Sequence, residues 1–249
     1  CNIKMKLLDR AAEYFLDNIS EKEKLLYNKF CEDNDYWLDS YSIFWNIRVL
    51  SNYKHWTNWK DSFKFREKIS IDQFRKKNKR EIKKTKCIQY FFQKQWNYLK
   101  EYANKNGIRI IGDLPLYVSH DSAEVWTNPE LFTLNKNGGL RYVSGVPPCF
   151  FSETGQLWGH PLYRWDVHKN TRFNWWKSRF KRLYELVDIV RIDHFNGFKK
   201  YWKIPAENAT AMNGEWAEGP GENLFEEIIN CLGNNAIIAE DLGEAQQEA

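Results

Sequence analysis

The chain has 249 residues, a formal net charge of +4 and 43% hydrophobic residues. This size and composition allow one large or two ordinary globular domains, and the modest charge gives no reason to expect nucleic acid as a partner. The sequence contains neither a run of about 18 apolar residues nor the features of a signal peptide, so we expect no membrane association. It starts "CNIKMKLLDR", without an initiator methionine, and we therefore expect a fragment of a longer protein.

Cysteine and aromatic content point to the compartment and to one class of ligand. The five cysteines are odd in number, lie far apart and show no metal-ligand spacing, which predicts reduced thiols, a cytoplasmic location and no metal site. The chain also has 12 Trp, 13 Tyr and 16 Phe. Aromatic rings fill protein cores, but they also match the apolar faces of sugars, so composition leaves sugar binding open.

The first part of the chain, residues 1–106, has apolar residues at helical spacing and almost no Gly or Pro, which predicts a mainly helical subdomain. Within it, the basic run "RKKNKREIKKTK" (75–86) has no interleaved aromatic residues. We expect it to form a solvated helix face rather than a nucleic-acid site. Gly107 follows as a C-cap that ends the last helix.

Residues 107–249 read differently, because short apolar strands alternate with helices and are followed by acidic residues. This pattern predicts parallel α/β units. If the strands belong to a (β/α)8 barrel, Asp113, Asp193 and Glu240 converge at its C-terminal face. The predicted elements are strand 108–113, an irregular stretch 114–170, helix 171–187, strand 188–193, helix 220–232 and strand 236–241.

The stretch "VRIDHF" (190–195) carries the clearest chemical signal. Residues two apart in a strand share a face, so Arg191 and Asp193 project together, whereas His194 faces away in a regular strand. Retaining glycoside chemistry uses two carboxyls, and Arg191 would keep Asp193 ionised as the nucleophile. The apolar run before Glu240 would raise the pKa of that side chain, as a general acid requires. The alternative is a structural ion pair and a helix-capping carboxylate, and spacing alone leaves both open.

Several blocks of the sequence resemble the amylomaltase family, which comprises the 4-α-glucanotransferases or disproportionating enzymes of the α-amylase superfamily. The resemblance covers about four-fifths of the chain, and its blocks are long and specific. They include "GDLPLYVSHDSAEVWTNPELF" (112–132), "SGVPPCFFSETGQLWGHPLYRWD" (144–166), "VDIVRIDHFNGF" (187–198) and "IIAEDLG" (237–243).

This resemblance implies a role for each matching position. Asp193 corresponds to the nucleophile that forms a covalent glucosyl-enzyme, Glu240 to the acid/base, and Arg191 to the arginine that accompanies the nucleophile. The segment 144–160 corresponds to a mobile lid loop over the active site. The implied substrate-binding residues are Asp113, Phe151, Gln156 and Trp158, with His194 as a further candidate.

The chain departs from the family pattern in two positions and in extent. It has Cys149 where relatives commonly have an acidic residue, and His160 where they commonly have Asn. Family members begin further upstream and continue to a strand with a His-Asp pair whose aspartate stabilises the transition state, and the tail "EAQQEA" leaves the pattern. The predicted fold is therefore α/β: an incomplete (β/α)8 TIM-barrel catalytic domain with a helical subdomain insertion.

The resulting prediction is a 4-α-glucanotransferase that moves α-1,4-glucan segments between maltooligosaccharides in starch, glycogen or maltose metabolism. The first alternative is a fragment that binds oligosaccharides without catalysis. The second is an acid-lined metal site on a barrel enzyme, which predicts dependence on a divalent metal. No motif calls for an organic cofactor, and the sequence makes no prediction of oligomeric state.

Overall fold

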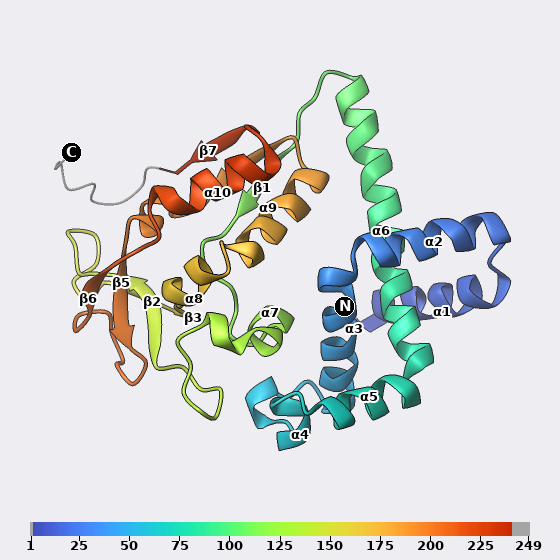
Figure 1. The fold of residues 1–249 in the computed structure, drawn as a ribbon, viewed down its shortest axis with the longest axis horizontal. Helices are drawn as coiled ribbons and strands as arrows, with labels where there is room; N and C mark the ends of the chain where they lie inside the picture. The colour runs from blue at the N-terminus through green and yellow to red at the C-terminus, as the bar shows by residue number, and fades with distance from the viewer. Residues whose placement is uncertain (1, 241–249) are drawn as a thin grey trace. The chain divides into compact units, whose positions relative to one another are not determined.

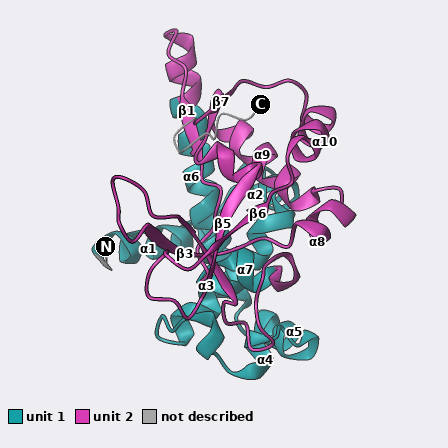
Figure 2. Ribbon diagram, turned by 90° about the vertical axis from the view of Figure 1, so that its left-hand side faces the viewer, with its two compact units in different colours: residues 1–99, 121–127 teal, residues 100–120, 128–249 magenta. Residues whose placement is uncertain are grey.

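The computed structural model describes residues 2–240, and the chain forms two compact units (Figures 1 and 2). Unit 1 comprises residues 1–99 and 121–127, and unit 2 comprises residues 100–120 and 128–249. The boundary between the units falls within helix α6, after residue 99, and residues 121–127 belong to the helical unit. From the sequence, the boundary was expected between residues 106 and 107. Asp241 and the tail, on which part of the sequence argument rests, lie outside the described residues.

Unit 1 consists of helices joined by short turns. Ser20 caps the second helix because its side-chain oxygen accepts the backbone N–H of Glu23 at 3.3 Å, which satisfies a donor that the helix leaves unpaired. Helix α6 ends as predicted, with Gly107 in a left-handed conformation (φ +75°). The helices are α1 (Asn2–Asn18), α2 (Glu21–Asp33), α3 (Asp35–Leu50), α4 (Asp61–Lys64), α5 (Lys68–Lys77), α6 (Lys79–Lys105) and α7 (Ala123–Thr127), with a 3-10 turn η1 (Trp56–Asn58).

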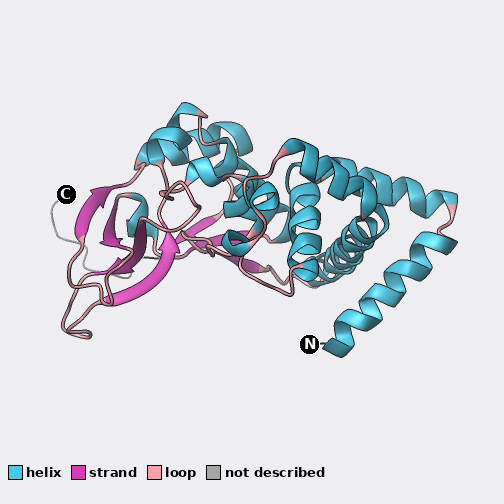
Figure 3. Ribbon diagram, turned by 90° about the horizontal axis from the view of Figure 1, so that it is seen from below, coloured by secondary structure: helices cyan, strands magenta, loops and turns pink. Residues whose placement is uncertain are grey.

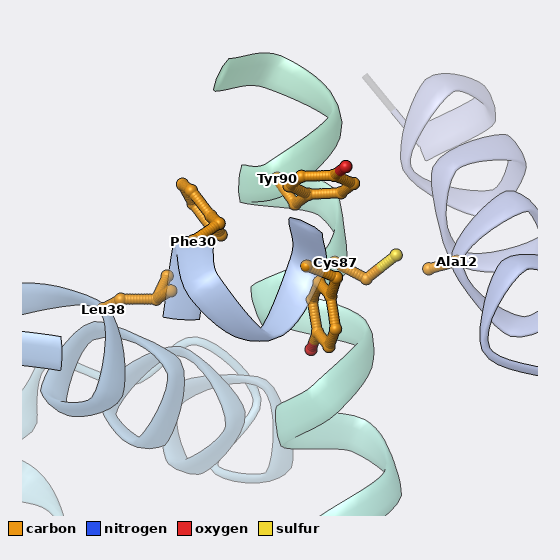
Figure 4. Close-up of a cluster of buried hydrophobic side chains, with 6 residues drawn as sticks. Ala12, Phe30, Leu38, Cys87 and Tyr90 are labelled. Carbon is orange, nitrogen blue, oxygen red and sulfur yellow. The ribbon is translucent and has the colours of Figure 1, made fainter. Parts of the chain in front are cut away.

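The core of unit 1 is an apolar cluster drawn from α1, α2, α3 and α6 (Figure 4). Ala12, Leu38 and Cys87 are fully buried, and the rings of Phe30 and Tyr90 pack 5.5 Å apart. Small residues on α1 and α6 allow these helices to approach the aromatic side chains of α2. The cluster therefore joins the first three helices to α6.

The basic run 75–86 is not the fully solvated face predicted. Arg75 and Lys86 both bind Asp39, at 2.6 and 2.7 Å. The side chain of Lys84 is only 8% exposed and contacts the carboxylates of Asp9 and Glu81 at 2.9 Å. The run thus serves as a set of ion-pair partners for acidic residues of unit 1, because its helical period directs several cations inward.

Unit 2 contains a three-stranded parallel sheet in the order β1-β4-β7, of which β1 and β7 are labelled in Figure 1. Its register pairs Asp113 with Arg191 and Arg191 with Ile238. Helix α9 packs on β1 and β4 and also on α10, as expected for parallel α/β units. The elements are β1 (Ile111–Leu114), α8 (Trp165–Asn170), α9 (Asn174–Leu186), β4 (Ile189–Ile192), α10 (Glu222–Leu232) and β7 (Ile237–Ala239), with 3-10 turns η2 (Pro129–Leu131) and η3 (Phe195–Phe198).

The predicted helix 171–187 begins later than expected. Arg172 and Phe173 have positive φ values of 52° and 54°, so the chain turns there between α8 and α9. Left-handed backbone is uncommon for such residues and interrupts a helix. Consequently, α8 and α9 are separate helices.

A second, antiparallel sheet in the order β3-β2-β5-β6 was not predicted. It comprises β2 (Tyr142–Val146), β3 (Gln156–Pro161), β5 (Lys200–Pro205) and β6 (Glu215–Glu218). Every strand of the described residues belongs to unit 2 (Figure 3). None of the helices between residues 2 and 240 is long and apolar enough to cross a bilayer.

Candidate active site

The carboxyl ends of the parallel strands bring the predicted charged residues together. Asp113 and Arg191 are paired across β1 and β4, and Asp193 follows β4 with its N–H bonded to the Leu114 carbonyl at 3.1 Å. Glu240 follows β7 and donates its N–H to the Ile192 carbonyl at 3.1 Å. Parallel strands end at one edge of the sheet, so the expected convergence of the three carboxylates is observed.

Arg191 lies at the centre of this group. Its Nη1 donates to Asp113 at 2.7 Å, and its Nη2 donates to Asp193 at 3.2 Å and to Glu240 at 2.7 Å. One guanidinium therefore serves three carboxylates. The Glu240 side chain is 15% exposed, against 44% for Asp193. The fork of N–H donors on arginine fixes the relative positions of the acids.

The pKa order of the two central carboxyls is opposite to the one predicted. Burial raises the pKa of Asp193, and its hydrogen bond with Glu240 and the negative charge nearby add to the increase despite Arg191. The pKa of Glu240 is lowered, first because the backbone N–H of His194 donates to its carboxylate at 2.7 Å. The prediction counted Arg191 as a partner of Asp193 alone and missed this N–H.

His194 does not continue the strand, which corrects the prediction that it faces away. Its backbone is left-handed (φ 53°), so the chain turns immediately after Asp193 and aims the His194 N–H at Glu240. The His194 ring meets the Trp158 ring edge-on, with 4.9 Å between centroids. Burial lowers the pKa of this imidazole. His194 thus contacts Glu240 through its backbone N–H and Trp158 of β3 through its ring.

The predicted sugar-contacting residues divide into two places. Gln156 and Trp158 lie on β3, where the indole N–H of Trp158 donates to the Gln156 side chain at 3.0 Å. Phe151 lies on the connection between β2 and β3, is 92% exposed, and packs against the equally open Phe150. The segment 144–160 is therefore a hairpin, with strand residues at both ends and two exposed aromatic rings between them.

Tyr117 also lies in this region, although it was not predicted as a site residue from the sequence. Its ring lies 6.1 Å from Trp158 and 6.5 Å from His160, and its hydroxyl is buried without a hydrogen-bond partner among residues 2–240. The signal available in the sequence was its position four residues after Asp113, on the segment that leaves β1. From the sequence alone, an aromatic ring at a ligand site cannot be distinguished from one that packs in the core.

The acidic cluster is not arranged to hold a metal ion. No group of three or more His, Cys, Asp and Glu side chains within the described residues could bind one. Arg191 supplies the positive charge at the point where the three carboxylates meet. Guanidinium and carboxylate satisfy each other directly through charge-assisted hydrogen bonds.

The fold is a mixed α/β arrangement that closely resembles a solved amylomaltase. It matches the structure of an amylomaltase from Streptococcus agalactiae in complex with acarbose with a TM-score of 0.92 and 40% identity, covering 99% of this chain and 49% of that one. The sequence profile described as 4-alpha-glucanotransferase matches residues 1–249. The chain therefore belongs to the 4-alpha-glucanotransferase family.

Curated relatives agree with this assignment. The chain is 44% identical over 249 residues to the 4-alpha-glucanotransferase of Clostridium butyricum, covering 99% of this chain and 50% of the relative. It is 40% identical to the chloroplastic/amyloplastic 4-alpha-glucanotransferase of Solanum tuberosum, covering 97% of this chain and 42% of the relative. The chain thus spans about half the length of the curated relatives it matches.

Proposed function

We propose that this chain carries the nucleophile and the acid/base of a retaining 4-alpha-glucanotransferase that transfers α-1,4-glucan segments between maltooligosaccharides. The observation that carries the proposal is the placement of Asp193 and Glu240 at adjacent strand ends, both bonded to Arg191. Membership of the family supports the reaction type. The chain spans about half the length of its relatives. The proposal concerns the complete transfer reaction.

Each carboxyl has one task in each half of the reaction. Asp193 attacks the anomeric carbon and forms a covalent glucosyl-enzyme, while Glu240 gives its proton to the departing glycosidic oxygen. In the second half, a hydroxyl of an acceptor sugar attacks the anomeric carbon. The bond to Asp193 breaks, and Glu240 takes the hydroxyl proton. Two inversions at one carbon give net retention.

The pair must separate for this chemistry. Retaining enzymes hold the two carboxyls about 5 to 5.5 Å apart, whereas here both contact the same nitrogen of Arg191, Asp193 at 3.2 Å and Glu240 at 2.7 Å. A sugar ring between them would exclude water from Glu240, which is already mostly buried. Desolvation raises the pKa of a carboxyl, so substrate binding would bring Glu240 toward the protonated form that an acid needs.

Transfer rather than hydrolysis requires that a sugar hydroxyl reach the intermediate before water does. The exposed rings of Phe150 and Phe151 on the β2–β3 connection are suited to cover a bound sugar, and Trp158 offers a stacking surface beside His194. Excluding water in this way also strengthens the electrostatic interactions within the site. We assign Asp113, Gln156, Trp158, Phe151 and His194 to glucan binding.

The second candidate function is oligosaccharide binding without catalysis. It is supported by the exposed rings of Phe150 and Phe151 and by Trp158 on β3, which can contact a glucan whether or not it reacts. Both functions use the same aromatic and acidic side chains, so binding data alone do not separate them. Product formation does.

The test is incubation of the purified chain with maltotriose, followed by separation of the products by length. A glucanotransferase yields glucose and a ladder of longer maltodextrins, and Asp193→Asn abolishes both. The matched control is Asp166→Asn, because Asp166 is an exposed acid paired with Arg164. Binding of maltotriose with no products from the unaltered chain would favour the binding function and refute catalysis by this chain.

We also propose a cytoplasmic location and a role in starch or glycogen metabolism. Cys31, Cys87, Cys149 and Cys231 are free thiols, which suits a reducing compartment. The name of the Solanum tuberosum relative places that protein in plastids. Fractionation of the source cells with an antibody to the chain tests the location directly.

A further inference from the structure

Strand β3 places a second ring beside Trp158. Gly159, between them, has a positive φ of 75°, and the pairing of β2 with β3 shifts register at this point. Trp158 and His160 lie on one side of the strand, as shown by the fact that both rings neighbour the ring of Tyr117. A glucan that lies on Trp158 and continues along β3 therefore reaches His160.

The His160 ring is held in a fixed orientation. It lies nearly parallel to the Tyr117 ring, at an angle of 19° and with 6.5 Å between centroids. Tyr117 is itself buried and stacks at 11° on Tyr163. The His160 backbone N–H donates to the buried Ser144 hydroxyl at 3.3 Å. Buried residues hold both the ring and the backbone of His160. This reduces the conformational entropy that His160 loses when a ligand binds.

The polar edge of His160 is available to a ligand. The ring is half-buried, and neither ring nitrogen has a hydrogen-bond partner among residues 2–240. Burial lowers the pKa of the imidazole, so the ring is neutral near pH 7 and offers one N–H donor and one nitrogen acceptor. A sugar hydroxyl is also both donor and acceptor, so the two groups are chemically complementary.

We propose that His160 binds a hydroxyl group of the glucose unit next to the one stacked on Trp158, and that it is a specificity-determining residue of the glucan site. This inference rests on the proposed function, because it requires a glucan on β3. The role proposed for His160 concerns affinity for the glucan. The bond-making and bond-breaking steps are assigned to Asp193 and Glu240.

The test is the affinity of the whole chain for maltoheptaose, measured by titration calorimetry. His160→Phe keeps a flat ring on Tyr117 but removes both nitrogens, and we expect the dissociation constant to rise about five- to tenfold, as for one lost hydrogen bond. His160→Asn retains a donor and an acceptor and should lose about threefold or less. The matched control is Leu157→Ala on the same strand, which should bind as the unaltered chain does.

Two further readouts separate binding from packing. In the unaltered chain the imidazole C–H resonances of His160 should shift when maltoheptaose is added, and His160→Phe should unfold at the same urea concentration as the unaltered chain. Unchanged affinity in His160→Phe, or an equal loss in Leu157→Ala, overturns the inference. If Trp158→Ala abolishes binding while His160→Phe does not weaken it, the proposed function stands and only this inference fails. No binding by the unaltered chain overturns both.

Discussion

A histidine buried among aromatic rings should make unit 2 sensitive to acid. His168 is fully buried, with its ring 5.4 Å from both Tyr163 and Trp165 and 5.7 Å from Trp175. Neither of its ring nitrogens has a hydrogen-bond partner within the described part of the chain. Burial lowers the pKa of His168 to about 4, although the Leu131 backbone and the Asp166 charge act in the opposite direction.

The sign of the effect follows from comparing the folded and unfolded states. In the unfolded chain the imidazole takes up a proton near pH 6.5, whereas in the folded chain it does so only near pH 4. Stability is therefore lost as the pH falls between these two values. Between pH 7 and about pH 4.5, the difference in proton binding corresponds to about 2.5 kcal/mol of unfolding free energy.

The substitution His168→Leu removes this titration while keeping an apolar side chain of similar size. We expect the free energy of unfolding of the variant to exceed that of the unaltered chain by about 2.5 kcal/mol more at pH 4.5 than at pH 7. Urea unfolding followed by near-ultraviolet circular dichroism reports on the tryptophans around this site. Leu157→Ala, which changes an exposed apolar side chain and no titrating group, is the control and should differ from the unaltered chain equally at both pH values. An equal difference at both pH values for His168→Leu would refute the reasoning, because other titrating groups cancel in the comparison.

Three further predictions concern the carboxylate site and the strand beside it. Arg191→Met should raise the pKa of both Asp193 and Glu240, read from carboxyl carbon shifts in a pH titration, and reduce maltotriose conversion about a hundredfold; an unchanged titration would contradict the central role of the guanidinium. Gly145→Ala should destabilise the hairpin by about 1–3 kcal/mol and weaken maltoheptaose binding, because the new methyl group would overlap the Gln156 carbonyl and contact the Ile204 side chain, and calorimetry tests both effects. Excess EDTA should leave the product ladder from maltotriose unchanged, since Arg191 already satisfies the acidic side chains; a loss restored by a divalent metal would show that this view of the cluster is wrong.

The parallel strands were predictable because each is a short apolar run with little competing signal. "IVRI" is a buried or partly buried run, "IIA" is a short apolar run that is more exposed, and both are rich in β-branched residues; the acidic residue after each one marks the end of the strand. Their shared edge then places Asp193 and Glu240 close together without knowledge of any contact. Convergence at the sheet edge thus followed from local sequence and one topological rule.

The antiparallel sheet was not predictable in the same way. Strand β2 contains Gly145, and β3 contains Gly159 and ends at Pro161, residues that usually indicate turns. What makes β2 a strand is its pairing with β5, about 60 residues further along the chain, in a register that sequence periodicity does not reveal, and β3 in turn pairs with β2. Tertiary pairing outweighs local preference here.

The protonation order failed for a related reason. Pairing Arg191 with Asp193 from their spacing was correct as far as it went, since the two are bonded at 3.2 Å. It did not include the left-handed turn at His194, which directs a backbone N–H at Glu240. A pKa depends on every donor that reaches the group, and donors contributed by the backbone leave no trace in residue identity.

His194 has one more consequence, for how the glucan site can change over time. Its ring packs edge-on against the Trp158 ring, and its backbone N–H donates to the Glu240 carboxylate. A mutation that reshapes the Trp158 surface to favour another chain length would also disturb the turn that sets the acidity of Glu240. Under the proposed function, sugar preference and catalytic rate are therefore coupled through His194, and a substitution that alters one requires a compensating change nearby.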